Sequence, residues 1–182
     1  PMARHLMITV ATALILGLSA PAFAAGGSSS GSGSSGDSSA TDHGCKKGEV
    51  WNKKAKKCQK AESGVLPDED LYQQGRYLAK KGYYDWALTV FAAIQNQEDP
   101  RVLNYIGYSH RKAGRLDIGI TYYRKALALN PNFVLAREYL GEGYVAAGRI
   151  DLARAELAEI ANRCGTTCEE YADLAKAIAE AN

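Results

Sequence analysis

The chain has few of the residues that build catalytic and metal sites. It contains only three His and four Cys among 182 residues. A structural metal site typically needs two closely spaced ligand pairs, whereas Cys45 and Cys58 lie 13 positions apart with only His43 near them. The glycines follow no predicted strand, which excludes a phosphate-binding loop. We therefore expect no catalytic residue, no metal, no cofactor and no enzyme activity.

Long apolar runs are also scarce. Arg4 precedes an uncharged stretch at residues 6–18, and the small-residue sequence A-F-A follows at 22–24. This stretch is shorter than the roughly 20 residues that a helix needs to cross a bilayer. A basic start, a short apolar segment and an A-x-A site are typical of a secretory signal peptide. We predict a signal peptide over residues 1–24, a periplasmic or secreted mature protein, and no membrane span after cleavage.

Two segments of unusual composition follow. Residues 25–40 are almost wholly Gly and Ser, so they carry little apolar surface to offset the entropy of ordering and are predicted to form a disordered linker. Residues 41–60, here called the basic segment, hold seven Lys against two acidic residues, a net charge of +5 against +2 for the whole chain. Any attraction to anionic surfaces should therefore reside in the basic segment.

The cysteines are expected to form two local disulfides. Export to an oxidising compartment favours disulfides, and proximity in sequence favours Cys45–Cys58 and Cys164–Cys168 over the two crossed pairings. The first bridge would close the basic segment, which is too small to hold itself together by a core alone. The second would join the end of one helix to the start of the next, with Gly165 in the turn.

The rest of the chain repeats itself. A pair of glycines seven residues apart occurs three times, at steps of 32 and then 34 residues, beginning with Gly75, Gly107 and Gly141. A repeat of this length indicates an array of helical hairpins whose neighbours stack to form one core. The acidic side chains of the last helix are expected to face solvent. The predicted array spans 61–167, with repeats at about 68–99, 100–133 and 134–167, and a capping helix at 168–182.

The residues around these glycines resemble the tetratricopeptide repeat. Its pattern places Leu-Gly and then Tyr on the first helix, and Ala, an aromatic residue and a closing Pro on the second. Gln74 departs from this pattern at a Leu position and Gly119 at an Ala position. The resemblance implies an all-α, right-handed solenoid of about three hairpins plus a capping helix, and a non-enzymatic binding scaffold. In the second unit it is carried by Leu103, Ile106, Gly107, Tyr123, Ala126 and Pro131.

The resemblance also implies where a protein or peptide partner binds. In this family the first helices of successive repeats line a concave groove. The predicted groove is basic and aromatic at one end and acidic at the other, which suits an extended or helical segment with an acidic stretch; Asn104 is expected to hydrogen-bond its backbone. The predicted groove residues are Tyr72, Arg76, Lys80, Asn104, Tyr108, Arg111, Lys112, Glu138 and Glu142.

The basic segment supports an alternative function. Trp51 would stack on a sugar ring while the surrounding lysines contact anionic groups, so that the segment binds an envelope glycan or another anionic polymer and the array is a spacer. If it binds nothing, Trp51 is simply the core of the segment and the lysines keep it soluble. Nucleic acid is not expected, because an exported protein rarely meets it. The residues concerned are Trp51, Lys53, Lys54, Lys56 and Lys57.

Overall fold

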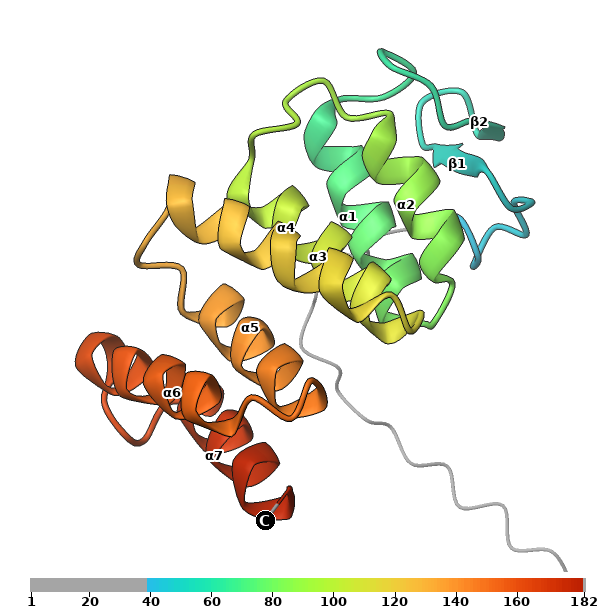
Figure 1. Ribbon diagram of the computed structural model, residues 1–182. Helices are drawn as coiled ribbons and strands as arrows, with labels where there is room; N and C mark the ends of the chain where they lie inside the picture. Colours follow the sequence, from blue (N-terminus) through green and yellow to red (C-terminus); the bar gives the residue numbers. More distant parts are fainter. Residues whose placement is uncertain (1–38, 182) are drawn as a thin grey trace, which may run out of the picture. The chain divides into compact units, whose positions relative to one another are not determined.

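The structure, a computed structural model, describes residues 39–181 (Figure 1). The predicted signal peptide and nearly all of the predicted linker lie outside the described residues. Among residues 39–181, none of the helices combines the length and the apolar character that crossing a membrane requires. The elements are β1 (Glu49–Asn52), β2 (Lys57–Lys60), α1 (Asp68–Lys80), α2 (Tyr84–Ala92), α3 (Pro100–Lys112), α4 (Leu116–Leu129), α5 (Val134–Ala146), α6 (Ile150–Cys164) and α7 (Glu169–Glu180).

Helices α1 to α6 form three helical hairpins, each closed by a glycine turn. Gly82, Gly114 and Gly148 follow the first helix of their hairpins with φ of 87°, 84° and 69°. Glycine adopts this left-handed backbone without the steric cost that a Cβ atom brings. The recurring glycines therefore place a turn after α1, α3 and α5, as the sequence predicts.

The other glycine of each pair lets neighbouring helices approach closely. A Cβ atom at Gly75 would lie 2.5 Å from the ring of Phe91, and one at Gly141 would overlap Leu174 of α7. Gly107 on α3 lies against Gly119 on α4, where a Cβ atom at Gly119 would come within 2.8 Å of the Gly107 carbonyl oxygen. The close approach of α3 and α4 therefore explains why Gly119 stands where the family pattern has Ala.

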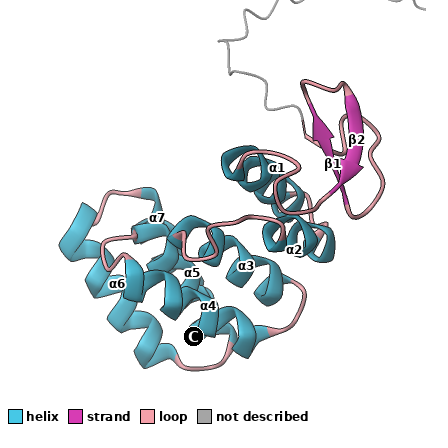
Figure 2. Cartoon of the chain, turned by 90° about the horizontal axis from the view of Figure 1, so that it is seen from above, coloured by secondary structure: helices cyan, strands magenta, loops and turns pink. Residues whose placement is uncertain are grey.

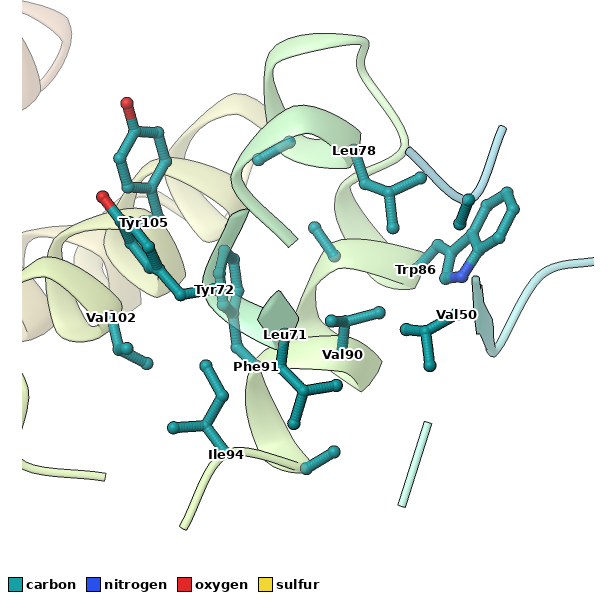
Figure 3. Packing of buried hydrophobic residues seen from close by; sticks show 14 of the residues in the cluster. Val50, Leu71, Tyr72, Leu78, Trp86, Val90, Phe91, Ile94, Val102 and Tyr105 are labelled. Atoms are coloured by element: carbon teal, nitrogen blue, oxygen red, sulfur yellow. The ribbon is translucent and has the colours of Figure 1, made fainter. Parts of the chain in front are cut away.

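Buried apolar side chains continue from one hairpin to the next. Leu71, Phe91 and Tyr105 belong to one cluster, contributed by α1, α2 and α3 (Figure 3). Tyr123 and Ile160 belong to a second cluster, contributed by α4 to α7. Because each cluster crosses between hairpins, no hairpin buries its apolar face alone. This arrangement confirms the predicted helical array.

The basic segment packs on the first hairpin. The Cys45–Cys58 disulfide closes it as predicted, with 5.5 Å between the Cα atoms. Val50 of β1 is fully buried in the cluster formed with α1 and α2, close to Trp86 (Figure 3). The indole Nε1 of Trp86 donates a hydrogen bond to the Glu49 carbonyl oxygen at 2.8 Å. Apolar burial therefore supports the segment together with the disulfide.

Gln74 explains how the sheet is held against α1. Its side chain is buried, and its Oε1 accepts a hydrogen bond from the Trp51 backbone N–H at 2.8 Å. Its Nε2 donates to the Trp51 carbonyl oxygen at 3.0 Å. The amide thus satisfies both backbone groups at the open edge of β1, as a neighbouring strand would. The Gln that replaces Leu in the family pattern is the residue that docks the sheet.

The folded part begins earlier than Thr41. Ala40 is fully buried, and its carbonyl oxygen accepts a hydrogen bond from the Cys45 N–H at 2.9 Å. Residue 40 therefore belongs to the ordered segment that leads into the hairpin, and not to the linker predicted to end there.

Helix α7 packs on α5 and α6, whereas the sheet lies by α1 and α2 (Figure 2). Leu174 and Ile178 are its buried residues. The predicted Cys164–Cys168 disulfide is present with 6.0 Å between the Cα atoms. Gly165 in the intervening turn has a φ of 82°. The capping helix and both local disulfides are confirmed.

Candidate partner-binding groove

A groove of about 430 Å³ runs along the first helices of the hairpins, α1, α3 and α5, and ends at the first turns of α7. Basic side chains line it at α1 and α3, carboxyl groups line it at α5 and α7, and tyrosines lie between them. Its lining residues are Arg76, Lys80, Tyr105, Tyr108, Lys112, Leu135, Glu138, Tyr139, Glu142, Glu169, Glu170 and Asp173.

Three tyrosines form the centre of the groove. Tyr105 and Tyr139 are buried, and their ring centroids lie 6.4 Å apart in an edge-to-face arrangement. Tyr108 lies 5.9 Å from Tyr105 and 5.2 Å from Tyr139. Aromatic rings packed in this way offer a large and rigid contact area at a low cost in side-chain entropy.

The tyrosines also position the basic side chains. The Nε atom of Arg76 donates a hydrogen bond to the Tyr105 hydroxyl at 3.0 Å. The Nζ atom of Lys80 donates to the Tyr139 hydroxyl at 3.0 Å and lies 5.1 Å from the ring centroid of Tyr108. Hydrogen bonds and cation–π contacts therefore hold these positive charges in fixed places along the groove.

Arg111, a predicted groove residue, lies beneath the surface. Its side chain is 9% exposed. It donates a hydrogen bond to the Tyr123 hydroxyl at 3.1 Å and forms an ion pair with Glu142. Burial lowers the pKa of Arg111, but Tyr123 and Glu142 raise it by more, so the guanidinium stays charged. Arg111 therefore joins α3, α4 and α5, and Glu142 already has a partner.

Two other predicted residues lie off the groove surface. Asn104 is fully buried, and among the described residues neither its Nδ2 nor its Oδ1 has a hydrogen-bond partner. Tyr72 lies in a neighbouring depression, where the Arg101 guanidinium is 4.6 Å from its ring centroid. Burial raises the pKa of Tyr72 to about 12. Of the predicted set, Arg76, Lys80, Tyr108, Lys112, Glu138 and Glu142 line the groove itself.

Sequence reasoning missed the two buried tyrosines and the contribution of α7. Tyr105 and Tyr139 occupy the same place in their repeats, two residues before Gly107 and Gly141, and this recurrence was the available signal. Glu169, Glu170 and Asp173 were expected only to face solvent. Helical spacing predicts which side of α7 is buried, but it does not tell what its first turns border.

Glu138 is the most deeply buried carboxyl group that lines the groove. The residue is 5% exposed and has no hydrogen bond or ion pair among the described residues. Burial raises its pKa to about 8, and the nearby charges of Glu142, Asp173 and Glu170 act in the same direction, while Lys80 opposes them. At neutral pH without a partner, Glu138 is therefore mostly protonated.

The predicted residues of the basic segment lie on another part of the surface. The Trp51 ring is stacked on His43, with 3.9 Å between the centroids and 10° between the planes. One face of the indole is therefore covered by His43, and that face is not open to a sugar. The lysines are exposed and surround the turn between β1 and β2; they are Lys53, Lys54, Lys56 and Lys57.

Two clusters among residues 39–181 combine cysteines with a carboxyl group at metal-ligand distances. One contains Glu49 with Cys45 and Cys58, and the other contains Glu170 with the second cysteine pair. All of these sulfurs are bonded in disulfides, so neither cluster offers a thiolate to a metal ion.

Stacked helical hairpins with a groove along their first helices define a helical-repeat protein. Residues 100–133, which include α3 and α4, match the family model described as tetratricopeptide repeat. The second hairpin is therefore similar to the tetratricopeptide repeat that its sequence resembles. A sequence comparison with curated proteins found no match.

Solved structures with the same fold include two that contain peptides. The first TPR of Spaghetti (RPAP3) bound to the HSP90 peptide SRMEEVD has a TM-score of 0.56 and 16% identity, over 66% of this chain and 96% of that chain. The Yersinia enterocolitica chaperone SycD, in complex with a peptide of the translocator YopD, has a TM-score of 0.54 and 19% identity, over 65% and 93%. At such identities the likeness concerns the fold.

A further similar structure is MamA from Desulfovibrio magneticus RS-1, with a TM-score of 0.49 and 24% identity. The match covers 52% of this chain and 54% of that chain. The chain thus matches only about half the length of the MamA chain.

Proposed function

We propose that this protein is an exported, non-enzymatic scaffold that holds a segment of a protein partner in the groove between α1 and α7. The observation that carries this proposal is the prearranged groove centre, where Tyr105 and Tyr139 are buried and hold Arg76 and Lys80 by hydrogen bonds. Side chains fixed before binding lose little entropy on binding, and this favours recognition of a flexible segment.

The fold supports a peptide as the class of ligand. The RPAP3 and SycD structures, which share the helical array, are complexes with an HSP90 peptide and a YopD peptide. The groove has opposite charge at its two ends, so the proposed segment carries an acidic residue near Arg76 and Lys112. The remainder of the segment lies against the tyrosines and Leu135.

Two features support export. The N-terminal sequence has the composition of a signal peptide, and each disulfide joins cysteines that are close in sequence. Disulfides persist in oxidising compartments such as the bacterial periplasm and the cell exterior. We propose a periplasmic or secreted protein on this basis.

In-cell crosslinking followed by affinity capture and mass spectrometry tests the groove. The variant is Lys112→Glu, because Lys112 lines the groove and reversal of Arg111 would instead place an unpaired charge in the interior. The control is Lys125→Glu on α4, since both lysines lie over a tyrosine ring, at 5.8 Å and 5.0 Å from the centroid, and only Lys112 lines the groove. Loss of one captured protein from Lys112→Glu alone supports the proposal; equal capture from both variants contradicts it.

A sedimentation assay with purified envelope polymer tests the alternative of an anionic glycan or polymer. Deletion of residues 41–60 is unsuitable, because it would uncover the apolar surface that Val50 covers. Replacement of the lysines by Gln keeps the sheet and removes only its charge. If envelope polymer sediments with the parent protein and not with this variant, the basic segment is a binding site. The lysines replaced are Lys53, Lys54, Lys56 and Lys57.

A further inference from the structure

We infer that the acidic end of the groove, formed by Glu138, Glu170 and Asp173, receives a lysine or arginine side chain of the bound segment. The inference rests on the proposed function and adds the chemistry of one partner residue. It assigns to α7 a direct part in recognition, beyond its role of covering the last hairpin.

Glu138 is a largely buried residue whose carboxyl group has no hydrogen-bond donor among residues 39–181. The residue is 95% buried, yet it lines the groove and has no hydrogen bond or ion pair among the described residues. A carboxyl group removed from water in this way loses solvation free energy unless a donor or a cation compensates it. A cation supplied by the partner would provide that compensation.

The basic side chains of the groove do not neutralise Glu138. Arg76 and Lys80 donate to the hydroxyls of Tyr105 and Tyr139. Arg111 is paired with Glu142. In the part of the chain that the structure describes, no basic side chain forms an ion pair with Glu138, although the charge of Lys80 favours its ionised form. The carboxyl group therefore remains available to a further cation.

Helix α7 adds more negative charge at the same place. Glu170 and Asp173 line the groove and have no ion pair or hydrogen bond among residues 39–181. A bound cation would therefore face carboxyl groups from two helices, α5 and α7. Glu138 is the buried member of the three, and a charge shielded from water by protein attracts an opposite charge more strongly than one in water.

A long cationic side chain fits this end better than a metal ion. Among the described residues, no three carboxyl groups of the groove bring ligand oxygens within 4.8 Å of one another. Leu135 and the rings of Tyr108 and Tyr139 also line the groove. They provide apolar and aromatic surface for the methylene groups of lysine or for the guanidinium plane of arginine.

The charges around Glu138 determine how binding responds to pH. Lys80 of α1 favours its ionised form, whereas Glu142 of α5 and Glu170 and Asp173 of α7 favour the protonated form. A cation binds the ionised form, so binding should release a proton from Glu138 near neutral pH. The affinity for an arginine-containing peptide should then increase as the pH rises from 6 to 8, because the pKa of Glu138 is about 8.

Selection from a phage-displayed library of random 12-residue peptides, with the protein spanning residues 25–182 as bait, tests the inference. Enriched peptides that share a Lys or Arg support it. Enriched peptides without a shared basic residue overturn it and leave the proposed function intact. The absence of any enrichment above a bait-free control overturns the proposed function, and the inference with it.

Variants then test whether the shared basic residue of the selected peptides binds at Glu138. Glu138→Gln keeps the shape of the side chain and should weaken the selected peptide about tenfold or more, the range expected for a lost charged hydrogen bond. Glu180→Gln is the control, since Glu180 is an exposed carboxylate at the far end of α7. Replacing the shared Lys by norleucine should weaken binding to the parent protein and have little effect on binding to Glu138→Gln. Equal losses with both proteins would overturn the inference.

Isothermal titration in buffers of different ionisation enthalpy provides a second readout. The parent protein should release protons on binding at pH 7, and Glu138→Gln should release fewer. Equal proton release from both proteins would show that Glu138 does not meet the cation.

Discussion

The two ends of the helical array are covered in different ways. At α1 and α2 the sheet contributes Val50 and backbone hydrogen bonds to Gln74, and none of its residues lines the groove. At α5 and α6 the cover is α7, which contributes Leu174 to the core and the carboxyl groups of its first turns to the groove. Both covers contain or adjoin a local disulfide.

The two covers therefore differ in role: one is structural and the other also contributes to the binding surface. The sequence alone does not distinguish these roles. The sheet carries the greatest density of positive charge, yet its contacts with the array are structural. Helix α7 looks like a simple cap, yet it completes the candidate site. A terminal element of a repeat array can therefore extend the binding surface when its first turns border the groove.

The largest expected effect is the loss of the α7 anchor. Leu174→Ala should lower the free energy of unfolding by about 2–5 kcal/mol, because it leaves a cavity over Gly141. Leu152→Ala is the control, since Leu152 is 42% exposed, and it should change stability by less than about 0.5 kcal/mol. Urea denaturation measures both variants. Similar losses would mean that Leu174 does not anchor α7.

Removal of each disulfide compares the two covers directly. In the chain-entropy model, replacing Cys45 and Cys58 by Ser should cost about 3 kcal/mol, and replacing Cys164 and Cys168 about 2 kcal/mol, because the second loop is shorter. Thermal and urea unfolding of the two double variants give the comparison. A larger loss at the shorter loop would contradict a purely entropic role for the bridges.

The hydrogen bonds that dock the sheet should have a smaller effect. Gln74→Ala leaves the Trp51 backbone N–H and carbonyl without their partner and should cost about 1–3 kcal/mol. Gln73→Ala removes only a side-chain bond to Glu69 on the same helix and should cost about 0.5 kcal/mol or less. Unfolding measurements on the two neighbouring variants isolate the docking contribution. Equal effects would argue against a docking role for Gln74.

The last prediction concerns Glu138 and pH. Its pKa is about 8 in the folded protein against 4.5 in an ordinary environment, so its ionisation disfavours the folded state as the pH rises through that window. Glu138→Gln cannot ionise and should gain thermal stability relative to the parent between pH 5 and pH 8. A difference in Tm that does not change with pH would contradict the buried, unpaired state of Glu138.

Much of the fold could be predicted from the sequence, because its signals are local and repeated. The glycines specify the turns after α1, α3 and α5, and proximity pairs the cysteines correctly. The docking of the sheet could not be predicted, since a single Gln at a Leu position gives no indication that its amide bonds a distant strand. The ordered position of Ala40 could not be predicted either, because it depends on contacts made by the folded segment.

The candidate site was less predictable than the fold. The family register identifies helix faces, and Lys80, Tyr108 and Glu138 do line the groove. It does not tell which side chains on a face are covered by neighbours. Arg111 and Asn104 are buried in the folded array. The carboxyl groups of α7 enter the groove through tertiary packing, which no local pattern encodes.

Site-specific photocrosslinking tests the central claim, that the groove binds the partner and the sheet covers the array. A benzophenone amino acid replaces Leu135 in the groove or Lys54 at the sheet turn, and the crosslinked proteins are identified by mass spectrometry from cells that express each variant. We expect one abundant partner from position 135, lost on Lys112→Glu, and none of it from position 54. Capture of the partner from position 54 alone would contradict the claim.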